Sequence, residues 1–389
     1  DDVRLLRRGI RCIGRQTTPD GLTYGHAPTI AHHCILPDFT LIWMISLWDD
    51  YWQSGSLETF MDAEIQDILQ KALAYFEHHS DPHTGLVRYD PRHWLFLDWA
   101  PLKKEGHPAI LSFWLLYTLD KLATLYTLSE DSERATRLKQ WAGRLRLALG
   151  NLLDPMDGLY VDGTDDNGLP YAGNKSVHTQ TLACLCGVAD SDQTKAHLIE
   201  GSLLPFVRGE DCPLVKPSVY WCTYVFSVLD LAGYGEDVVR YIRRHWAQMA
   251  DHGTTWSQMK GYGGEQSHSH AWSAHPLYHL MQIVGGIRQT APAWRRIEFR
   301  PLLWDRSAEI TIPTPQGQIE AHWSKSSENE AQVSLHLPAG IEAKVILPGL
   351  EPLSVGAGLW QWSVPAGDQP SFLEPQLLSH PPISTSIHS

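Results

Sequence analysis

Residues 36–52 read LPDFTLIWMISLWDDYW, and they carry a pattern that recurs along the first three quarters of the chain. Proline and aspartate stand at the start, where a helix accepts a fixed φ and a capping side chain. The apolar run that follows has no polar stripe, which is typical of a helix surrounded by other helices. We predict a buried helix at about 38–53 with Asp38 as its N-cap.

The same periodicity predicts further helices on both sides of this one. Each is followed by a loop that carries Trp, Asp or His, and no short solenoid repeat is evident. About ten helices with their chemistry confined to the loops indicate a mainly α fold, an (α/α)6 six-hairpin toroid whose loops form a cleft at one end. Such a toroid needs twelve helices, so we expect the first ones to lie upstream of residue 1. The other predicted helices span about 1–15, 57–79, 108–128, 131–152, 176–188, 192–207, 218–233, 235–250 and 270–286.

After residue 290 the pattern changes to short alternating runs separated by Pro, Gly and Asn. This texture predicts the strands of a small antiparallel β-sandwich. We therefore divide the chain into a helical barrel domain at 1–290, a β-sandwich domain at 291–365 and a tail rich in Pro and Ser at 366–389. The runs that predict strands are IEFRP (297–301), AEITIP (308–313), QIEAHWSK (318–325), AQVSLHLP (331–338) and EAKVILPG (342–349).

Composition excludes several partners. The chain has 389 residues, 43% hydrophobic and 19% charged, with a formal net charge of -13, so a nucleic acid is not an expected partner. No stretch approaches the ~20 apolar residues that a membrane span requires, so we expect no membrane partner either.

The six cysteines form no C-x-x-C pair, which favours buried, reduced thiols and a cytoplasmic location. The sequence gives no oligomeric state.

Sixteen tryptophans and twenty histidines are unusual counts for this length. Tryptophans can fill a thick core, but those beside polar residues can also stack on sugar rings. The densest such segment is 253–276, GTTWSQMKGYGGEQSHSHAWSAHP, a glycine-bearing loop that enters a helix. No H-E-x-x-H motif or cysteine set accompanies its histidines, so we expect neither a metal nor another cofactor. Its candidate site residues are Trp256, Ser257, Glu265, His270, Trp272 and His275.

Three other segments hold candidate residues at loop-to-helix junctions. In WLFLDWAPL (94–102), Asp98 stands between bulky apolar neighbours that can raise a carboxyl pKa, as a general acid requires, although bracing a loop is an equal alternative. NKSVHTQT (174–181) and KPSVYWCTYVF (216–226) could equally supply helix caps or wall contacts. The substrate-binding candidates in and around these segments are Trp43, Trp99, His178 and Tyr220.

Together these segments resemble the catalytic domain of glycoside hydrolase family 78, the inverting α-L-rhamnosidases. The resemblance follows the chain in order over about residues 1–365. It rests on LPDFTLIW (36–43), FLDW (96–99), GTTW (253–256) with SHAWSAHP (269–276), and the β-domain segments that begin with APAWRRIEFRP (291–301). It implies an (α/α)6 barrel and a carbohydrate or glycoside substrate that ends in L-rhamnose.

The same resemblance implies where the catalytic residues should lie. Hydrolysis with inversion requires a general acid and a general base. The family's general acid belongs to a D-C-P-x-R-x-E segment that nothing in residues 1–20 matches. Its general base is a Glu directly after the Trp of the T-T-W stretch, where this chain has Ser257; Glu265 is the nearby carboxylate. The predicted function is therefore a rhamnosidase-like glycosidase. The alternatives are a sugar-binding homologue without hydrolysis, and β-elimination from a uronate with Tyr220 or a histidine as base.

Overall fold

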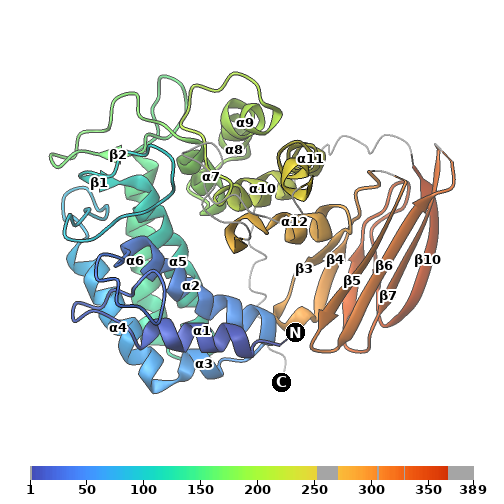
Figure 1. Ribbon diagram of the computed structural model, residues 1–389, viewed down its shortest axis with the longest axis horizontal. Helices are drawn as coiled ribbons and strands as arrows, with labels where there is room; N and C mark the ends of the chain where they lie inside the picture. Colours follow the sequence, from blue (N-terminus) through green and yellow to red (C-terminus); the bar gives the residue numbers. More distant parts are fainter. Residues whose placement is uncertain (1, 252–269, 305, 328, 367–389) are drawn as a thin grey trace.

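A computed structural model describes residues 2–251, 270–304, 306–327 and 329–366 of the chain. Helices fill the first part and two four-stranded sheets the second, so the predicted mainly helical chain with a C-terminal β-structure is confirmed (Figure 1). The helices are α1 (Arg4–Gly14), α2 (Pro37–Ser54), α3 (Glu58–Met61), α4 (Ala63–His78), α5 (Ala109–Leu128), α6 (Ser132–Gly150), α7 (Val177–Leu185), α8 (Asp192–Leu198), α9 (Leu204–Arg208), α10 (Cys222–Leu231), α11 (Gly235–Asp251) and α12 (Pro276–Ile283).

Five helices pack against one another in chain order. Helix α2 contacts α5, α5 contacts α7, α7 contacts α10, and α10 contacts α12. Three helices flank this row: α1 packs against α2, α6 against α5, and α11 against both α10 and α12. Figure 1 shows the resulting wall curving from α4 and α5 over α7 to α11 and α12.

Helix α2 illustrates why the inner row forms. Pro37 occupies its first turn, and its last turn ends at Gly55, whose φ of 71° is a left-handed conformation that glycine adopts without strain. Nine of its 18 residues are buried, among them most of the apolar ones. The N-cap prediction for Asp38 is wrong, because the helix begins one residue earlier and Leu36 is the N-cap.

Two predicted helices are interrupted. The one at 57–79 breaks at Asp62, whose extended backbone ends α3 and whose carboxylate caps α4 by accepting from Glu64 N and Ile65 N. The one at 192–207 contains a π-helical turn at Ile199–Leu203 between α8 and α9. In both places the apolar periodicity continues across the break, so the pattern alone did not reveal it.

The C-terminal sheets have the strand orders β10-β7-β6-β5 and β3-β4-β8-β9. The first sheet is antiparallel throughout, but β4 and β8 pair in parallel, which differs from the purely antiparallel prediction. The strands β3, β9 and β10 lie outside the predicted runs. Strand bounds are β3 (Ile287–Gln289), β4 (Arg296–Phe299), β5 (Ser307–Thr314), β6 (Gly317–Lys325), β7 (Glu330–Leu337), β8 (Glu342–Val345), β9 (Leu353–Val355) and β10 (Gly358–Pro365), and a small pair β1 (His107–Pro108) and β2 (Gly163–Thr164) precedes them.

Two hydrophobic cores meet at the junction of helices and sheets. Val284, just after α12, packs against both cores. The fully buried Trp323 of β6 donates its indole N–H to Val284 O at 2.9 Å. Gln289 Nε2 likewise donates to Trp52 O at 2.7 Å. The sheets are therefore bonded directly to the helical part.

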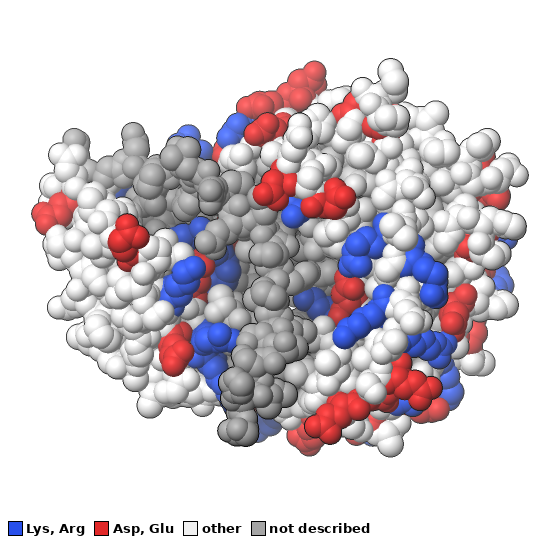
Figure 2. All heavy atoms as spheres, turned by 180° about the vertical axis from the view of Figure 1, so that it is seen from behind, with Lys and Arg blue, Asp and Glu red and all other residues white. Residues whose placement is uncertain are grey.

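The composition also led to expectations about surface charge, membrane spans and the burial of cysteines. On the face seen in Figure 2, basic and acidic side chains are interspersed. No helix in the described ranges is long and apolar enough to cross a membrane. Four cysteines are buried, as predicted: Cys184, Cys186, Cys212 and Cys222. The prediction is wrong for Cys12, which is exposed, and Cys34 is half-buried.

Candidate active site

Seven aromatic side chains from four chain segments meet at the start of the inner helices. We call them the aromatic cluster: Phe39, Trp94, Phe96, Trp99, Tyr220, His270 and Trp272. At its centre, the ring centroids of Tyr220 and Trp272 lie 4.7 Å apart, and those of Phe96 and Trp272 lie 5.6 Å apart. Phe39 in the first turn of α2 closes the group, 6.1 Å from Trp272. Aromatic faces with polar edges suit the apolar face of a sugar ring.

The structure brings together four of the predicted substrate-binding residues. These are Trp99, Tyr220, His270 and Trp272, of which His270 lies 5.1 Å from the Trp272 ring. Sequence reasoning missed Phe39, Phe96 and Trp94. Their positions next to polar residues could have indicated a site, because Phe39 follows Asp38 directly and Phe96 stands two residues before Asp98. Both aromatics looked like core residues in apolar surroundings.

Asp98 organises the polar layer beneath the cluster. Its side chain is fully buried, and its Oδ2 accepts from His178 Nε2 at 2.7 Å and from Ser218 N at 2.9 Å. Its Oδ1 accepts from Trp99 N at 2.7 Å and from Ser218 Oγ. Both oxygens are thus occupied and shielded from solvent. This argues against the general-acid role predicted for Asp98 and favours the alternative of bracing loops.

His178 is the second member of this layer, and its role follows from Asp98. Because a carboxylate only accepts, Nε2 of His178 carries the proton, and the ring packs edge-on to Trp221 with centroids 4.5 Å apart. The residue is fully buried on α7. It therefore ties the start of α7 to the loops that carry Trp99 and Ser218, one layer below the cluster.

Asp38 holds the turn that carries Phe96. It is 3% exposed, and its carboxyl group accepts from Leu97 N at 2.8 Å and from Phe96 N at 3.4 Å. Leu97 has a positive φ of 56°, a conformation that costs a non-glycine residue about 1–3 kcal/mol. The Asp38 carboxyl group thus binds the backbone of this strained residue, and Asp98, the next residue in the chain, is fixed by its own hydrogen bonds to His178, Ser218 and Trp99.

The ionisation of Asp38 gives a testable pH dependence. Burial raises the pKa of this carboxyl to about 6, against the opposing effect of the two backbone donors. A raised pKa favours the protonated form in the folded state, so its contribution to stability is full below about pH 4 and is lost as the pH rises through 6. We expect the unfolding free energy of the wild type, relative to Asp38→Asn, to fall by roughly 1–3 kcal/mol between pH 4 and pH 6.5 in urea titrations. A flat or rising difference would contradict this.

His275 differs from its predicted role. As the N-cap residue of α12, it bonds to Val219 O through Nε2 at 2.8 Å, and its ring packs on Phe226 and Trp246, with centroids 5.5 Å from each. Burial lowers its pKa to about 4, so it is neutral at pH 7. It fixes the 219–220 backbone to α12 and thereby supports Tyr220. Within the described ranges, no group of three or more His, Cys, Asp or Glu is arranged to hold a metal ion.

Trp43 lies in the wall and not in the cluster. It is 3% exposed and donates its indole N–H to Ile10 O at 2.9 Å, which joins α2 to α1. This placement argues against the substrate-binding role predicted for it. Three other predicted site residues, Trp256, Ser257 and Glu265, lie outside the described residues.

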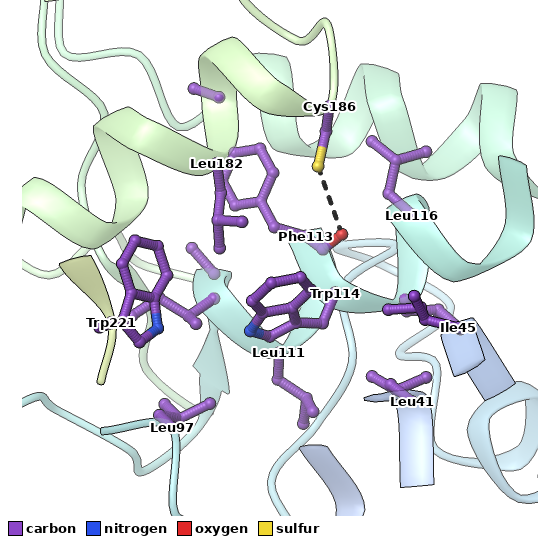
Figure 3. Close-up of a cluster of buried hydrophobic side chains, with 14 of the residues drawn as sticks. Leu41, Ile45, Leu97, Leu111, Phe113, Trp114, Leu116, Leu182, Cys186 and Trp221 are labelled. Atoms are coloured by element: carbon purple, nitrogen blue, oxygen red, sulfur yellow. Dashed lines mark hydrogen bonds between the residues drawn. The ribbon is translucent and has the colours of Figure 1, made fainter. Parts of the chain in front are cut away.

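A dense core supports the cluster from below. Figure 3 shows Trp114 and Phe113 of α5 with Leu182 of α7 and Trp221 at the start of α10, next to Leu97. Trp221 is completely buried, and Cys186 Sγ contacts Phe113 O at 3.6 Å. A surface hollow of about 430 Å³ lies elsewhere, lined by residues such as Met61, Tyr126 and Arg134. Tyr126 stands near the far end of α5, so this hollow is remote from the cluster.

Comparisons with known proteins agree with this architecture. Residues 286–357 match the family described as bacterial alpha-L-rhamnosidase C-terminal domain. The GH78 family rhamnosidase of Bacillus sp. GL1 has a TM-score of 0.78 at 25% identity, covering 90% of this chain and 37% of that one. The alpha-L-rhamnosidase from Dictyoglumus thermophilum has a TM-score of 0.76 at 16% identity, covering 93% of this chain and 44% of its own.

The Streptomyces avermitilis alpha-L-rhamnosidase, whose structure is a complex with L-rhamnose, has a TM-score of 0.73 at 18% identity. The match covers 93% of this chain and 36% of that one. The chain thus spans less than half the length of these three relatives. No curated protein matches the chain in sequence. The resemblance is confirmed in two ways: the chain shares its fold over about 90% of its length with a family 78 rhamnosidase, and residues 286–357 match the C-terminal domain of bacterial α-L-rhamnosidases.

Proposed function

We propose that the aromatic cluster binds a terminal L-rhamnose and that the protein to which this chain belongs hydrolyses α-L-rhamnosides with inversion. The observation that carries the proposal is the match to the Bacillus sp. GL1 rhamnosidase over 90% of this chain. A relative of the same fold was crystallised with L-rhamnose. We further propose that the helical row is part of an (α/α)6 toroid.

The chemistry of the cluster supports this substrate. Rhamnose has an apolar methyl group and a C–H-rich ring face, which aromatic rings can cover without leaving hydrogen-bonding groups unpaired. Half-buried Trp99, Tyr220 and Trp272 offer such rings. His270, in contact with Trp272, can exchange hydrogen bonds with ring hydroxyls.

The catalytic acid and base have to be residues other than Asp38 and Asp98. Inversion requires an acid and a base about 6.5–9.5 Å apart with a water between them. Asp38 and Asp98 are 3% and 2% exposed, and their oxygens are engaged by backbone and side-chain donors, so neither reaches a leaving group. By the family resemblance, we propose that the acid is a residue other than Asp38 and Asp98 and that Glu265, the carboxylate near Ser257, is the base.

A second candidate is sugar binding without hydrolysis. It is favoured by Ser257, which stands where the family resemblance implies a glutamate base. The third possibility named from the sequence was β-elimination from a uronate with Tyr220 or a histidine as base, and the surroundings of Tyr220 disfavour this residue in that role. Burial raises the pKa of Tyr220 well above its ordinary value, so its phenol stays protonated at neutral pH and cannot accept a proton.

Trp272→Ala tests the binding site. We expect the dissociation constant for L-rhamnose, measured by calorimetry, to rise about 5- to 150-fold, because a stacked aromatic anchor of about 1–3 kcal/mol is lost. Trp360→Ala is the matched control, since Trp360 is exposed on β10, far along the chain in the second part. Unchanged affinity in Trp272→Ala would remove this residue from the site.

Turnover separates the two candidates. The protein is incubated with an aryl α-L-rhamnoside, and the anomeric form of the first released rhamnose is followed by NMR. Release of the inverted anomer supports the glycosidase. Binding of L-rhamnose without release supports the sugar-binding homologue, and no binding would reject both.

A further inference from the structure

Trp94 is the outermost ring of the aromatic cluster. Its side chain is 41% exposed, whereas Phe96, two residues on, is 3% exposed. Single exposed apolar residues are ordinary on protein surfaces. Trp94 differs because it contacts two cluster rings, lying 5.8 Å from Phe96 and 6.5 Å from Trp99 between centroids. It therefore extends the cluster to the surface.

The rings form a strip and not a single platform. From Trp272 the strip steps 5.6 Å to Phe96, and from Phe96 it steps 5.8 Å to Trp94. The inner end adjoins Tyr220, which directly precedes the fully buried Trp221. One six-membered ring that stacks on Trp272 and Tyr220 leaves the outer step uncovered. Phe96 lies between Trp94 and Trp272, so a group in contact with Trp94 lies beyond a sugar that contacts Trp272.

The outer ring is held in place before any ligand arrives. Trp94 donates its backbone N–H to Ile35 O at 3.2 Å. Its loop is also fixed through Asp38, which bonds to Phe96 and Leu97, and through Asp98. A rigid aromatic platform binds a flat partner at little cost in conformational entropy. Trp94 is therefore an exposed aromatic side chain on a backbone fixed by hydrogen bonds.

We infer that Trp94 is a specificity-determining residue that stacks on the group joined to the rhamnose, a second sugar ring or an aromatic ring. This inference rests on the proposed function, because it takes the inner part of the cluster as the rhamnose position. Trp94 contributes recognition of the leaving group and takes no part in the chemistry. A methyl group in place of the second ring would not reach it.

The test compares three ligands with the full chain. L-Rhamnose, methyl α-L-thiorhamnoside and phenyl α-L-thiorhamnoside resist hydrolysis, and calorimetry gives their dissociation constants. We expect Trp94→Ala to weaken phenyl thiorhamnoside binding about tenfold and to leave the other two unchanged within about twofold. Trp94→Phe keeps a ring and should retain most of the affinity. Trp360→Ala, which removes a similarly exposed tryptophan from β10, should change none of them. A rhamnobiose thio-analogue in place of the phenyl compound then shows whether a sugar ring gains the same way.

Each outcome decides something different. If the wild type binds the ligands and Trp94→Ala affects none, or affects all three equally, the inference is wrong while the proposed function stands. If the wild type binds none of the three, the proposed function fails and the inference fails with it. A thermal unfolding curve of each variant identifies any loss of affinity that comes from unfolding.

Discussion

Asp98→Ala is expected to lower the free energy of unfolding by about 3–5 kcal/mol, because several buried donors lose their acceptor at a cost of about 1–3 kcal/mol each. The substitution leaves His178 Nε2, Ser218 N and Ser218 Oγ without their acceptor in a region that water does not reach. Each unsatisfied buried donor adds a desolvation penalty. Urea-induced unfolding, followed by tryptophan fluorescence, measures the change.

The control for Asp98→Ala is Asp166→Asn, which alters an exposed carboxylate in the turn after β2. It should change stability by less than about 0.5 kcal/mol. Asp98→Asn keeps the shape but presents an amide N–H₂ to a donor, so it should be nearly as harmful as alanine. A loss below about 1 kcal/mol in Asp98→Ala would mean that Asp98 does not hold the loops together.

Trp323→Ala is the second substitution with a large expected effect, again about 3–5 kcal/mol of unfolding free energy. Trp323 is fully buried in β6, and its loss leaves a cavity in the sheet core. It also removes the hydrogen bond to Val284 O, one of the links between the sheets and α12. Calorimetric unfolding should show a lower midpoint.

Two variants separate the causes of the Trp323 effect. Trp323→Phe keeps most of the apolar volume but has no N–H donor. Its decrease in unfolding free energy therefore measures the cost of the unsatisfied Val284 carbonyl together with that of a smaller cavity. Trp360→Ala, at a tryptophan 38% exposed on β10 of the same sheet, should cost little. Equal losses in Trp323→Ala and Trp360→Ala would contradict the role given to burial.

The sequence predicted element types well because long periodic segments carry their own signal. Helix α5 was expected at 108–128 and spans Ala109–Leu128, since it is apolar on all sides. The break at Asp62 was missed because it depends on a capping bond inside a continuous apolar pattern. Strand β10 was missed because its residues are largely exposed, so the apolar alternation that marks a strand is weak there.

The site was predictable in part for a related reason. Tyr220 and Trp272 stand at loop-to-helix junctions, which the toroid argument had marked as cleft positions, and the structure brings them within 4.7 Å. Trp43 was misassigned because helical spacing does not show which neighbour a buried ring meets. Asp98 was assigned a possible acid role from its apolar neighbours, but three of its four donors belong to His178 and Ser218, which lie 80 and 120 positions away in the chain.

The starts of α2, α7 and α10 converge on the two buried carboxyl groups, and this gives the site its electrostatic character. The peptide dipoles of a helix add up to about half a positive charge at its N-terminus. Asp38 lies in the first turn of α2, and Asp98 accepts from residues at the starts of α7 and α10. Backbone N–H groups thus bind both Asp38 and Asp98, and the side chains of His178 and Ser218 complete the donors around Asp98. The aromatic cluster that these acids support offers apolar rings to an uncharged sugar.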